Sequence, residues 1–348
     1  MQSRPYNPSL HRLAVLTAAA TFPLIFMGGL VTSHKAGMSV PDWPNSYGYN
    51  MFLFPPRLWI GGILYEHTHR LMGTVVGMLS IALCAWAWMS GARRSVRWLA
   101  TAVLGAVIFQ GVLGGLRVVL VNLDLAVVHG CFAQAFFCLT ALVAVVTSRW
   151  WNESPDLSDS PAGHSLLSLS VAATAVVYLQ LVAGALMRHF DAGLAIPDLP
   201  LAYGHLLPPT TAAELAKVNA QRAWQLNLDR VTLGQIWLHF AHRLGAILVT
   251  AVLGWLIVKV LRHHRRRGLL FPALLLILLL ITQITLGVLS VLLRKPADIA
   301  TLHVATGALV LVTTFVLNVR AWRLYRPRKL HVDTPADQRI HAFEPVAA

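Results

Sequence analysis

The sequence predicts an all-α integral membrane protein with eight transmembrane helices, arranged as two parallel four-helix-bundle repeats. Hydrophobic residues make up 56% of the 348 residues and charged residues only 12%, whereas soluble domains carry roughly 25% charged residues. Eight apolar stretches reach the length of about 20 residues that a helix needs to cross the hydrocarbon layer. The chain also repeats itself about halfway along, as membrane proteins built from two copies of one unit do.

The predicted spans are separated by short polar connections and by two longer loops. They lie near residues 11–33, 67–90, 97–120, 125–148, 164–188, 236–261, 269–293 and 298–322. From them we predict an N-terminal four-helix repeat over 1–149, a cytoplasmic linker over 150–163, a C-terminal four-helix repeat over 164–325 and a cytoplasmic tail over 326–348.

Basic residues indicate how the chain crosses the membrane. They cluster at residues 93–97, 262–267 and 320–329, and Arg4 and Arg12 stand near the first span. The positive-inside rule places these clusters, and both termini, in the cytoplasm, so that loops 34–66 and 189–235 lie outside. We expect a bacterial plasma membrane, because the first ten residues are too short for a signal peptide or an organellar presequence. The same clustering accounts for the net charge of +14 without a nucleic-acid partner.

The three cysteines, Cys84, Cys131 and Cys138, all fall inside apolar stretches. We expect them to pack as small hydrophobic side chains. Neither a structural disulfide nor a metal-binding thiol spacing is predicted.

The two halves match in several segments. Gly28–Gly48 and Gly184–Gly204 share AG, PD, P and YG in register, 156 residues apart. The recurring positions further along are His69-Arg70-Leu71 with His242-Arg243-Leu244, Gln110 with Gln283, and His129 with His303, at offsets of 173 or 174. The second outer loop is therefore about 17 residues longer. Because each unit has four spans, both units enter the membrane with the same polarity, and matched residues lie at equal depth.

Four of the fifteen histidines occupy matched places in the predicted spans: His69, His129, His242 and His303. All four lie early in spans that run inward, so we expect them at one level near the outer face. Ionisable groups inside apolar spans are costly and usually functional. The alternative for any single histidine is a hydrogen bond between helices, but four in duplicate register favour ligands.

Small residues follow each histidine one turn later, and they favour a flat ligand. They are Gly73, Ala133, Ala246 and Gly307, with Gly77 a further turn beyond Gly73. Residues at i and i+4 share a helix face, so a macrocycle bound by the imidazole has room there. Close helix packing is the alternative explanation for such residues.

Two imidazoles from facing helices of a four-helix bundle form a haem site. A zinc site requires three or four ligands, and each half offers only two well-placed histidines. We therefore predict two haem irons, one bound by His69 and His129 and one by His242 and His303. Since both axial positions are filled, each haem either carries electrons or is itself modified at its edge.

The halves differ one turn before the first histidine of each pair, where Glu66 stands opposite His239. Glu66 and His69 share a helix face, so this carboxylate can accept a proton or stabilise positive charge beside a haem edge. The alternative is a glutamate favoured by the helix dipole alone.

Arg70 and Arg243 follow their histidines directly. We expect them to pair with haem propionates, the alternative being extension to the outer headgroups. The segments Pro41–Pro44 and Pro197–Pro200 predict rigid turns over the sites. The roles of His67, His239 and the rest of the outer loops stay open.

These residues together resemble the haem A synthase family. The resemblance rests on AGMSVPDWPNSYG, Glu66-His67-Thr68-His69-Arg70, QGVLGGLRV from Gln110, His129-Gly130, His242-Arg243 and the final TLHVATG, and it covers about residues 10–320. It implies oxidation of a ring methyl of haem O to the formyl group of haem A, through a hydroxymethyl intermediate and with oxygen from water.

The resemblance also implies roles for the predicted residues. His69 and His129 would hold the substrate haem, Glu66 would be the catalytic carboxylate, and His242 and His303 would ligate a haem b cofactor. Haem O, and with it haem O synthase, would be the partners. Some family members carry a cysteine pair in the first outer loop, which this chain lacks. The electron acceptor, the oligomeric state, including a homo-oligomer, and the route of haem O delivery stay open.

Two other functions compete with this one at the level of sequence. The first is a non-catalytic di-haem cytochrome that passes electrons between quinol and a partner, which gives no reason for a carboxylate in only one half. The second is a transporter with parallel repeats, whose sites usually lie at broken helices near the midplane. The eight spans show no matched interruption.

Overall fold

The computed structural model describes residues 6–263 and 267–326. In this part of the chain eight helices are long and apolar enough to cross a membrane. They are α1 (Pro8–Ser33), α2 (Gly62–Met89), α3 (Arg94–Val119), α4 (Leu123–Thr147), α6 (Pro161–His189), α8 (Leu233–His263), α9 (Arg267–Leu292) and α10 (Ala297–Tyr325). The predicted all-α membrane fold is confirmed, and each predicted span overlaps one helix.

Local sequence sets the starts of several helices. Asn7 and Asn122 accept backbone N–H groups at the starts of α1 and α4, and Ser160 does so before α6, where Pro161 occupies the first position. Such residues satisfy N–H groups that the helix itself leaves unpaired. Helix α2 begins five residues before the predicted span, so Glu66 lies within its first turns. Helices α1 and α9 continue through Pro23 and Pro272.

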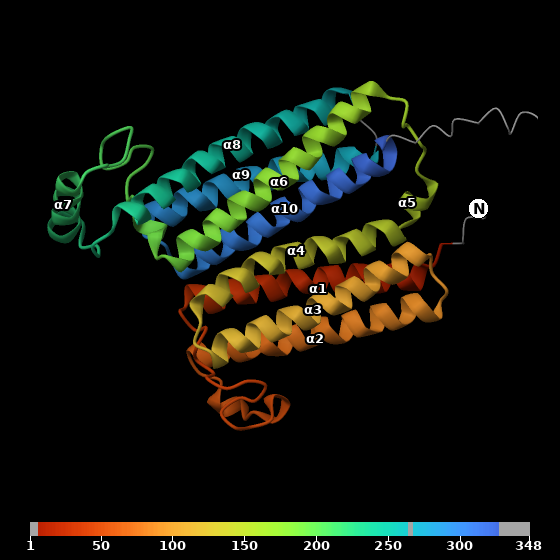
Figure 1. Ribbon diagram of the computed structural model, residues 1–348, viewed down its shortest axis with the longest axis horizontal. Helices are drawn as coiled ribbons and strands as arrows, with labels where there is room; N and C mark the ends of the chain where they lie inside the picture. The colour runs from red at the N-terminus through yellow and green to blue at the C-terminus, as the bar shows by residue number, and fades with distance from the viewer. Residues whose placement is uncertain (1–5, 264–266, 327–348) are drawn as a thin grey trace, which may run out of the picture.

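The helices form two groups of four (Figure 1). In the first group α1 and α3 each pack against α2 and α4, and in the second group α6 and α9 each pack against α8 and α10. The groups meet where α10 lies against α1 and α4, and where α4 lies against α6. The order of neighbouring helices is therefore the same in both groups.

The buried apolar core of each group lies at the end away from the histidines. In α2 it includes Val76, Leu83 and Ala87, all after His69, and in α8 it runs from Val249 to Val260, after His242. The corresponding core residues of α1, α3, α6 and α9 lie in the first parts of those helices. The ends that carry the histidines are thus packed by other residues.

The two long loops project from the same end of the molecule, opposite the end that carries the N-terminal part of α1 and the short helix α5 (Arg149–Glu153) (Figure 1). The first loop contains the 3-10 turns η1 (Met51–Leu53) and η2 (Pro56–Leu58). The second contains η3 (Ala192–Leu194), α7 (Ala212–Gln221) and η4 (Arg222–Leu226). The extra residues predicted for the second loop form α7 and η4. Of the basic cluster between α8 and α9, Arg265 and Arg266 lie outside the described residues, as do residues 327–348 of the predicted tail.

Candidate functional site

His69 on α2 and His129 on α4 face each other in the first group of helices. Their ring centroids are 6.4 Å apart and the rings are nearly perpendicular, at 80°. A bond from a metal to an imidazole nitrogen is about 2 Å long, and each ring adds about 1 Å from that nitrogen to its centre, so two imidazoles on one metal have centroids about 6 Å apart. The pair is therefore spaced as two axial ligands of a single metal would be.

Each of the four predicted histidines lies against a glycine of a neighbouring helix. A Cβ atom built on that glycine would lie 3.1–3.2 Å from the Cε1 atom of the imidazole. The pairs are Gly28 with His69, Gly114 with His129, Gly184 with His242, and Gly287 with His303. The glycines thus let the Cε1 edge of each ring approach the adjacent helix, and a larger residue would displace the ring.

Several polar atoms around the histidines have no partner. The Nδ1 atoms of His69, His129 and His303 are buried without a hydrogen-bond partner, as are the Oε1 atoms of Gln110 and Gln283. Buried polar atoms are nearly always paired, so each unpaired atom requires an explanation. A ligand that meets these nitrogen and amide oxygen atoms would supply one.

The second pair, His242 on α8 and His303 on α10, lies among glutamine side chains. Gln180 Nε2 is 3.1 Å from His242 Nδ1, and Gln283 Nε2 is 3.5 Å from His303 Nε2. A hollow of about 370 Å³ lies one turn beyond His242 and is lined by Ala246, Ile247, Thr250, Ala251 and Ile284. Amide groups thus lie beside the two imidazoles, and the hollow is open on the surface between α8 and α9, where Ile247 and Ile284 are exposed.

The small residues predicted to make room for a ring differ in how much space surrounds them. Nothing lies within 4 Å of a Cβ atom built on Gly73 or Gly77. At Gly307, in contrast, Leu181 Cδ2 would lie 2.9 Å away. The expected space is therefore present beyond His69, whereas beyond His303 a neighbouring leucine fills it.

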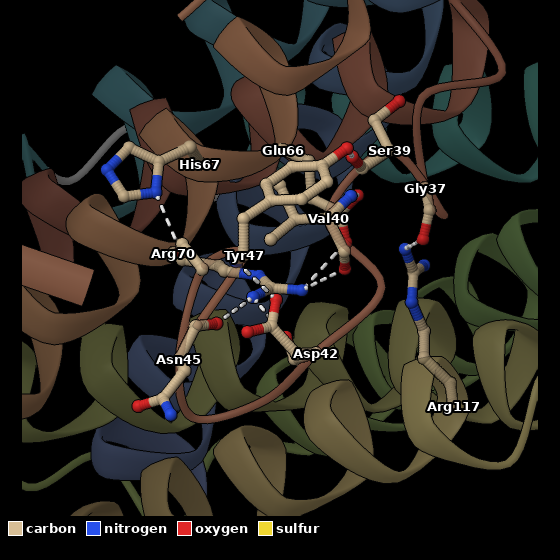
Figure 2. Close-up of polar contacts among 11 residues, drawn as sticks. Gly37, Ser39, Val40, Asp42, Asn45, Tyr47, Glu66, His67, Arg70 and Arg117 are labelled. Atoms are coloured by element: carbon tan, nitrogen blue, oxygen red, sulfur yellow. Dashed lines mark hydrogen bonds and ion pairs between the residues drawn. The ribbon is translucent and has the colours of Figure 1, made fainter. Parts of the chain in front are cut away.

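Glu66 is buried, with only 3% of its surface exposed, and is hydrogen-bonded to the first outer loop. Its Oε2 atom accepts the backbone N–H of Val40 at 2.8 Å, and its Oε1 atom pairs with Arg70 at 3.1 Å (Figure 2). In the second group Ile196, the residue matched to Val40, donates its N–H to Nδ1 of His239 at 3.3 Å. Glu66 and His239 therefore make the same loop contact with different chemistry.

Arg70 and Arg243 donate hydrogen bonds to backbone carbonyl groups of the two long loops. Arg70 donates to the carbonyls of Val40, Asp42 and Asn45 (Figure 2). Arg243 donates to the matched carbonyls of Ile196, Asp198 and Leu201. The predicted contact of these guanidinium groups with propionates stays a prediction; the structure gives both groups a loop-holding role.

Asp42 and Asp198 close the two Pro-Asp turns. Asp42 accepts the N–H groups of Tyr47 and Gly48 at 2.7 and 2.8 Å, and Asp198 accepts those of Tyr203 and Gly204 at 2.8 and 2.9 Å. Partial burial raises the pKa of Asp42, but these N–H groups and the charge of Arg70 outweigh it, so the pKa lies below its ordinary value of 3.8. The turns are therefore closed by carboxylates.

Two residues near the site received no role from the sequence, His67 and Arg117. His67 is fully buried between the rings of Phe54 and Trp59, with Ser46 Oγ 3.2 Å from its Nδ1 atom. Arg117, in the last turn of α3, donates to the carbonyl of Gly37 at 2.8 Å (Figure 2). The sequence signal for Arg117 was a charged residue near the end of an apolar span, three residues after Gly114.

Within the described ranges, no three His, Cys, Asp or Glu side chains come together as a metal site. The binding of iron by the histidine pairs stays a prediction.

Comparison with known proteins gives a consistent result. A family model described as cytochrome oxidase assembly protein, COX15-CtaA, matches residues 62–316. A protein named "Heme A synthase" from Shewanella oneidensis is 25% identical over 331 residues, covering 88% of this chain and 95% of the relative. Proteins of the same name from Halalkalibacterium halodurans and Shouchella clausii are 24% and 28% identical, covering 88% and 82% of this chain and 94% and 88% of the relatives.

Proposed function

This chain belongs to the COX15-CtaA family of cytochrome oxidase assembly proteins, and from this premise we propose that it is a haem A synthase, an oxidoreductase acting on haem O. The observation that carries the proposal is the His69–His129 pair, whose centroids are 6.4 Å apart, with the buried carboxylate of Glu66 one turn away on α2. The full-length similarity to proteins named "Heme A synthase" supports the assignment.

The proposed reaction converts a ring methyl of haem O into the formyl group of haem A. In the first oxidation a C–H bond of the methyl breaks, a C–O bond to water forms, and protons and an electron pair leave. A second oxidation of the hydroxymethyl group adds another water-derived oxygen, and loss of water from the resulting diol gives the formyl group. The protein must therefore hold the ring, take up protons and pass on electrons.

We assign proton uptake in the first site to Glu66. The carboxylate is positioned by Val40 N–H and by Arg70, and each oxygen retains a lone pair for a further hydrogen bond. A carboxylate held in this way can accept a proton released at a haem edge and lower the energy of developing positive charge. In the second half the matched residue is His239, so only the first half has an anionic group at this point.

The second pair of histidines fits a haem b cofactor. Among the described residues His303 Nδ1 is buried without a partner, Gly184 and Gly287 leave room for the two imidazoles, and Gln180 and Gln283 lie beside them. His242 and His303 would hold the iron of haem b. Haem b, when bound, would accept electrons from the substrate site and pass them to an acceptor. The protein's own residues orient the imidazoles, and His239 stands at the position where the first half has Glu66.

We further propose that residues 1–149 form the substrate-binding, catalytic half and residues 164–325 the cofactor half, joined by a cytoplasmic linker over 150–163. Both termini would be cytoplasmic in a bacterial plasma membrane, with the sites near the outer face. The matched loop contacts of Arg70 and Arg243 support an internal duplication. Haem O synthase is the partner we expect to supply the substrate.

The proposal is tested by substituting Glu66. In a strain that depends on this protein for haem A, we expect Glu66→Gln to retain bound haem and to lower haem A production by about 100-fold or more, since a general acid or base contributes roughly 100- to 10,000-fold. The measurement is chromatography of haems extracted from the purified protein and from membranes. The matched control is Glu153→Gln, an exposed glutamate on α5.

The outcomes separate the candidate functions. Haem O or haem A beside haem b in the wild-type protein supports a synthase. Haem b alone, with no conversion by the wild type, would indicate an electron-carrying cytochrome. Normal haem A from Glu66→Gln would remove this residue from the mechanism.

A further inference from the structure

The geometry points to Arg117 as the residue that binds a propionate of the substrate haem and so sets which ring edge faces Glu66. This inference rests on the proposed function. Arg117 lies on α3, a helix that contributes none of the four histidines. The roles proposed for His69 and His129 are unchanged.

Arg117 lies directly outward of the histidine pair. Gly114 on α3 contacts the imidazole of His129, and Arg117 follows it by three residues, on the same face of the helix. Three residues correspond to a rise of about 4.5 Å. Because α3 ends at Val119 beside the outer loops, this rise leads toward the outer end of the bundle. A ring held between His69 and His129 would extend an edge toward the guanidinium.

The guanidinium of Arg117 has N–H groups left for a further hydrogen-bond partner. In the part of the chain that the structure describes, its hydrogen-bond partner is the carbonyl of Gly37, bound through Nη2. Arg117 is half-buried, and its remaining N–H groups are not among the buried unpaired atoms. Arg70, in contrast, is committed to Glu66 and three loop carbonyls. Of these two arginines near the first site, Arg117 is the one with capacity for a carboxylate.

The second half places a cation at the same point by a different route. Gly193 is matched to Gly37, and a Cβ atom built on it would lie 3.8 Å from Nζ of Lys295. The residue matched to Arg117 is Ser290, so the lysine reaches this glycine from the connection between α9 and α10. Arg117 and Lys295, which do not correspond in the repeat, thus place a positive charge beside Gly37 and Gly193, which do. This indicates an anionic ligand group near each glycine.

The difference between the two cations fits the difference between the two ligands. The planar guanidinium binds a carboxylate through two parallel hydrogen bonds, which fixes its orientation, whereas an ammonium acts as a point charge. A substrate oxidised at one methyl must be held in one orientation, but an electron-carrying haem needs no such control. The arginine therefore belongs at the reactive site.

The inference is tested with haem O and with haem O esterified at both propionates, titrated into purified protein that contains haem b and followed by absorption. We expect wild-type protein to bind the free acid roughly 10- to 100-fold more tightly than the diester, as for a hydrogen bond to a charged group. Arg117→Gln should lose this preference and leave diester binding unchanged. Arg117→Lys should restore part of it. The matched control is Arg94→Gln, an exposed arginine at the other end of α3.

Each result decides one question. If Arg117→Gln retains the wild-type preference, or if it weakens both ligands equally while Arg117→Lys does the same, the inference is wrong and Arg117 only holds the loop. If wild-type protein binds neither ligand and makes no haem A, the proposed function itself fails. Retention of the haem b absorption band in every variant shows that the protein is folded.

Discussion

At the scale of single residues, the sites depend on glycines as much as on histidines. An imidazole in a membrane helix can point toward several neighbours, and here each of the four rings lies against a glycine on the adjacent helix. The glycine fixes the distance between the helices at that level, and so the position of the ring. The repeated histidines are visible in the sequence, whereas the contact of each ring with a glycine appears only in the structure.

We therefore expect Gly287→Val to lower haem b content more than a substitution elsewhere in the same group. Its Cβ atom would lie 3.1 Å from Cε1 of His303, and added atoms in a packed site cost about 1–3 kcal/mol. The measurement is the ratio of haem b to protein by absorption after purification. Gly254→Val on α8, where nothing lies within 4 Å of the Cβ position, should keep normal haem b; equal losses in both variants would contradict this account.

At the scale of elements, the outer loops are held over the sites by a common set of contacts. The carboxylate of Asp42 or Asp198 closes each turn. Arg70 on α2 or Arg243 on α8 donates hydrogen bonds to three loop carbonyls. The side chain of Glu66 or His239 accepts one loop N–H. The repeated Pro-Asp motif predicted a turn, and the structure contains it. The loop therefore helps to position the proposed catalytic carboxylate, since the bond from Val40 fixes one oxygen of Glu66.

The first loop should loosen in acid. The folded pKa of Asp42 lies below its ordinary value of 3.8. Its contribution to the stability of the folded loop is therefore complete above pH 3.8, and it is lost as the pH falls through the lowered folded pKa. Asp42→Asn should remove part of this contribution at neutral pH, about 1 kcal/mol for one lost hydrogen bond. The measurement is amide hydrogen exchange of residues 40–49. Asp198→Asn should act on the second loop and leave the first unchanged; if it loosens both loops equally, the turns are not independent.

At the scale of the whole molecule, two four-helix groups pack side by side with their loops at one end (Figure 1). Ser33 on α1 bonds to Thr301 on α10 at 2.8 Å, and Arg188 on α6 donates to the same serine. These contacts lie close in sequence to Gly28 and His303. The two proposed haem sites thus lie near hydrogen bonds that cross the interface between the groups, at the end that carries the two long loops.

The orientation in the membrane is tested by labelling. We expect a cysteine replacing Trp224, which is 89% exposed in the second outer loop, to react with a membrane-impermeant maleimide in intact spheroplasts. A cysteine replacing Asn152 on α5 should react only after lysis, because the positive-inside rule places that connection in the cytoplasm. The wild type is the control for Cys84, Cys131 and Cys138. The reverse pattern of labelling would invert the proposed topology.

The sequence by itself determined the membrane class, the eight spans and the four histidines, because apolar length and the recurrence of residues are properties of the chain alone. It also drew attention to Glu66 and the paired turns. Only the tertiary structure decided which atoms meet: that Arg70 and Arg243 bind loop carbonyls, that Gly307 is filled by Leu181, and that Arg117 reaches the site from α3. A side chain's partner depends on how helices distant in sequence pack, and spacing along one helix does not specify the neighbour across from it.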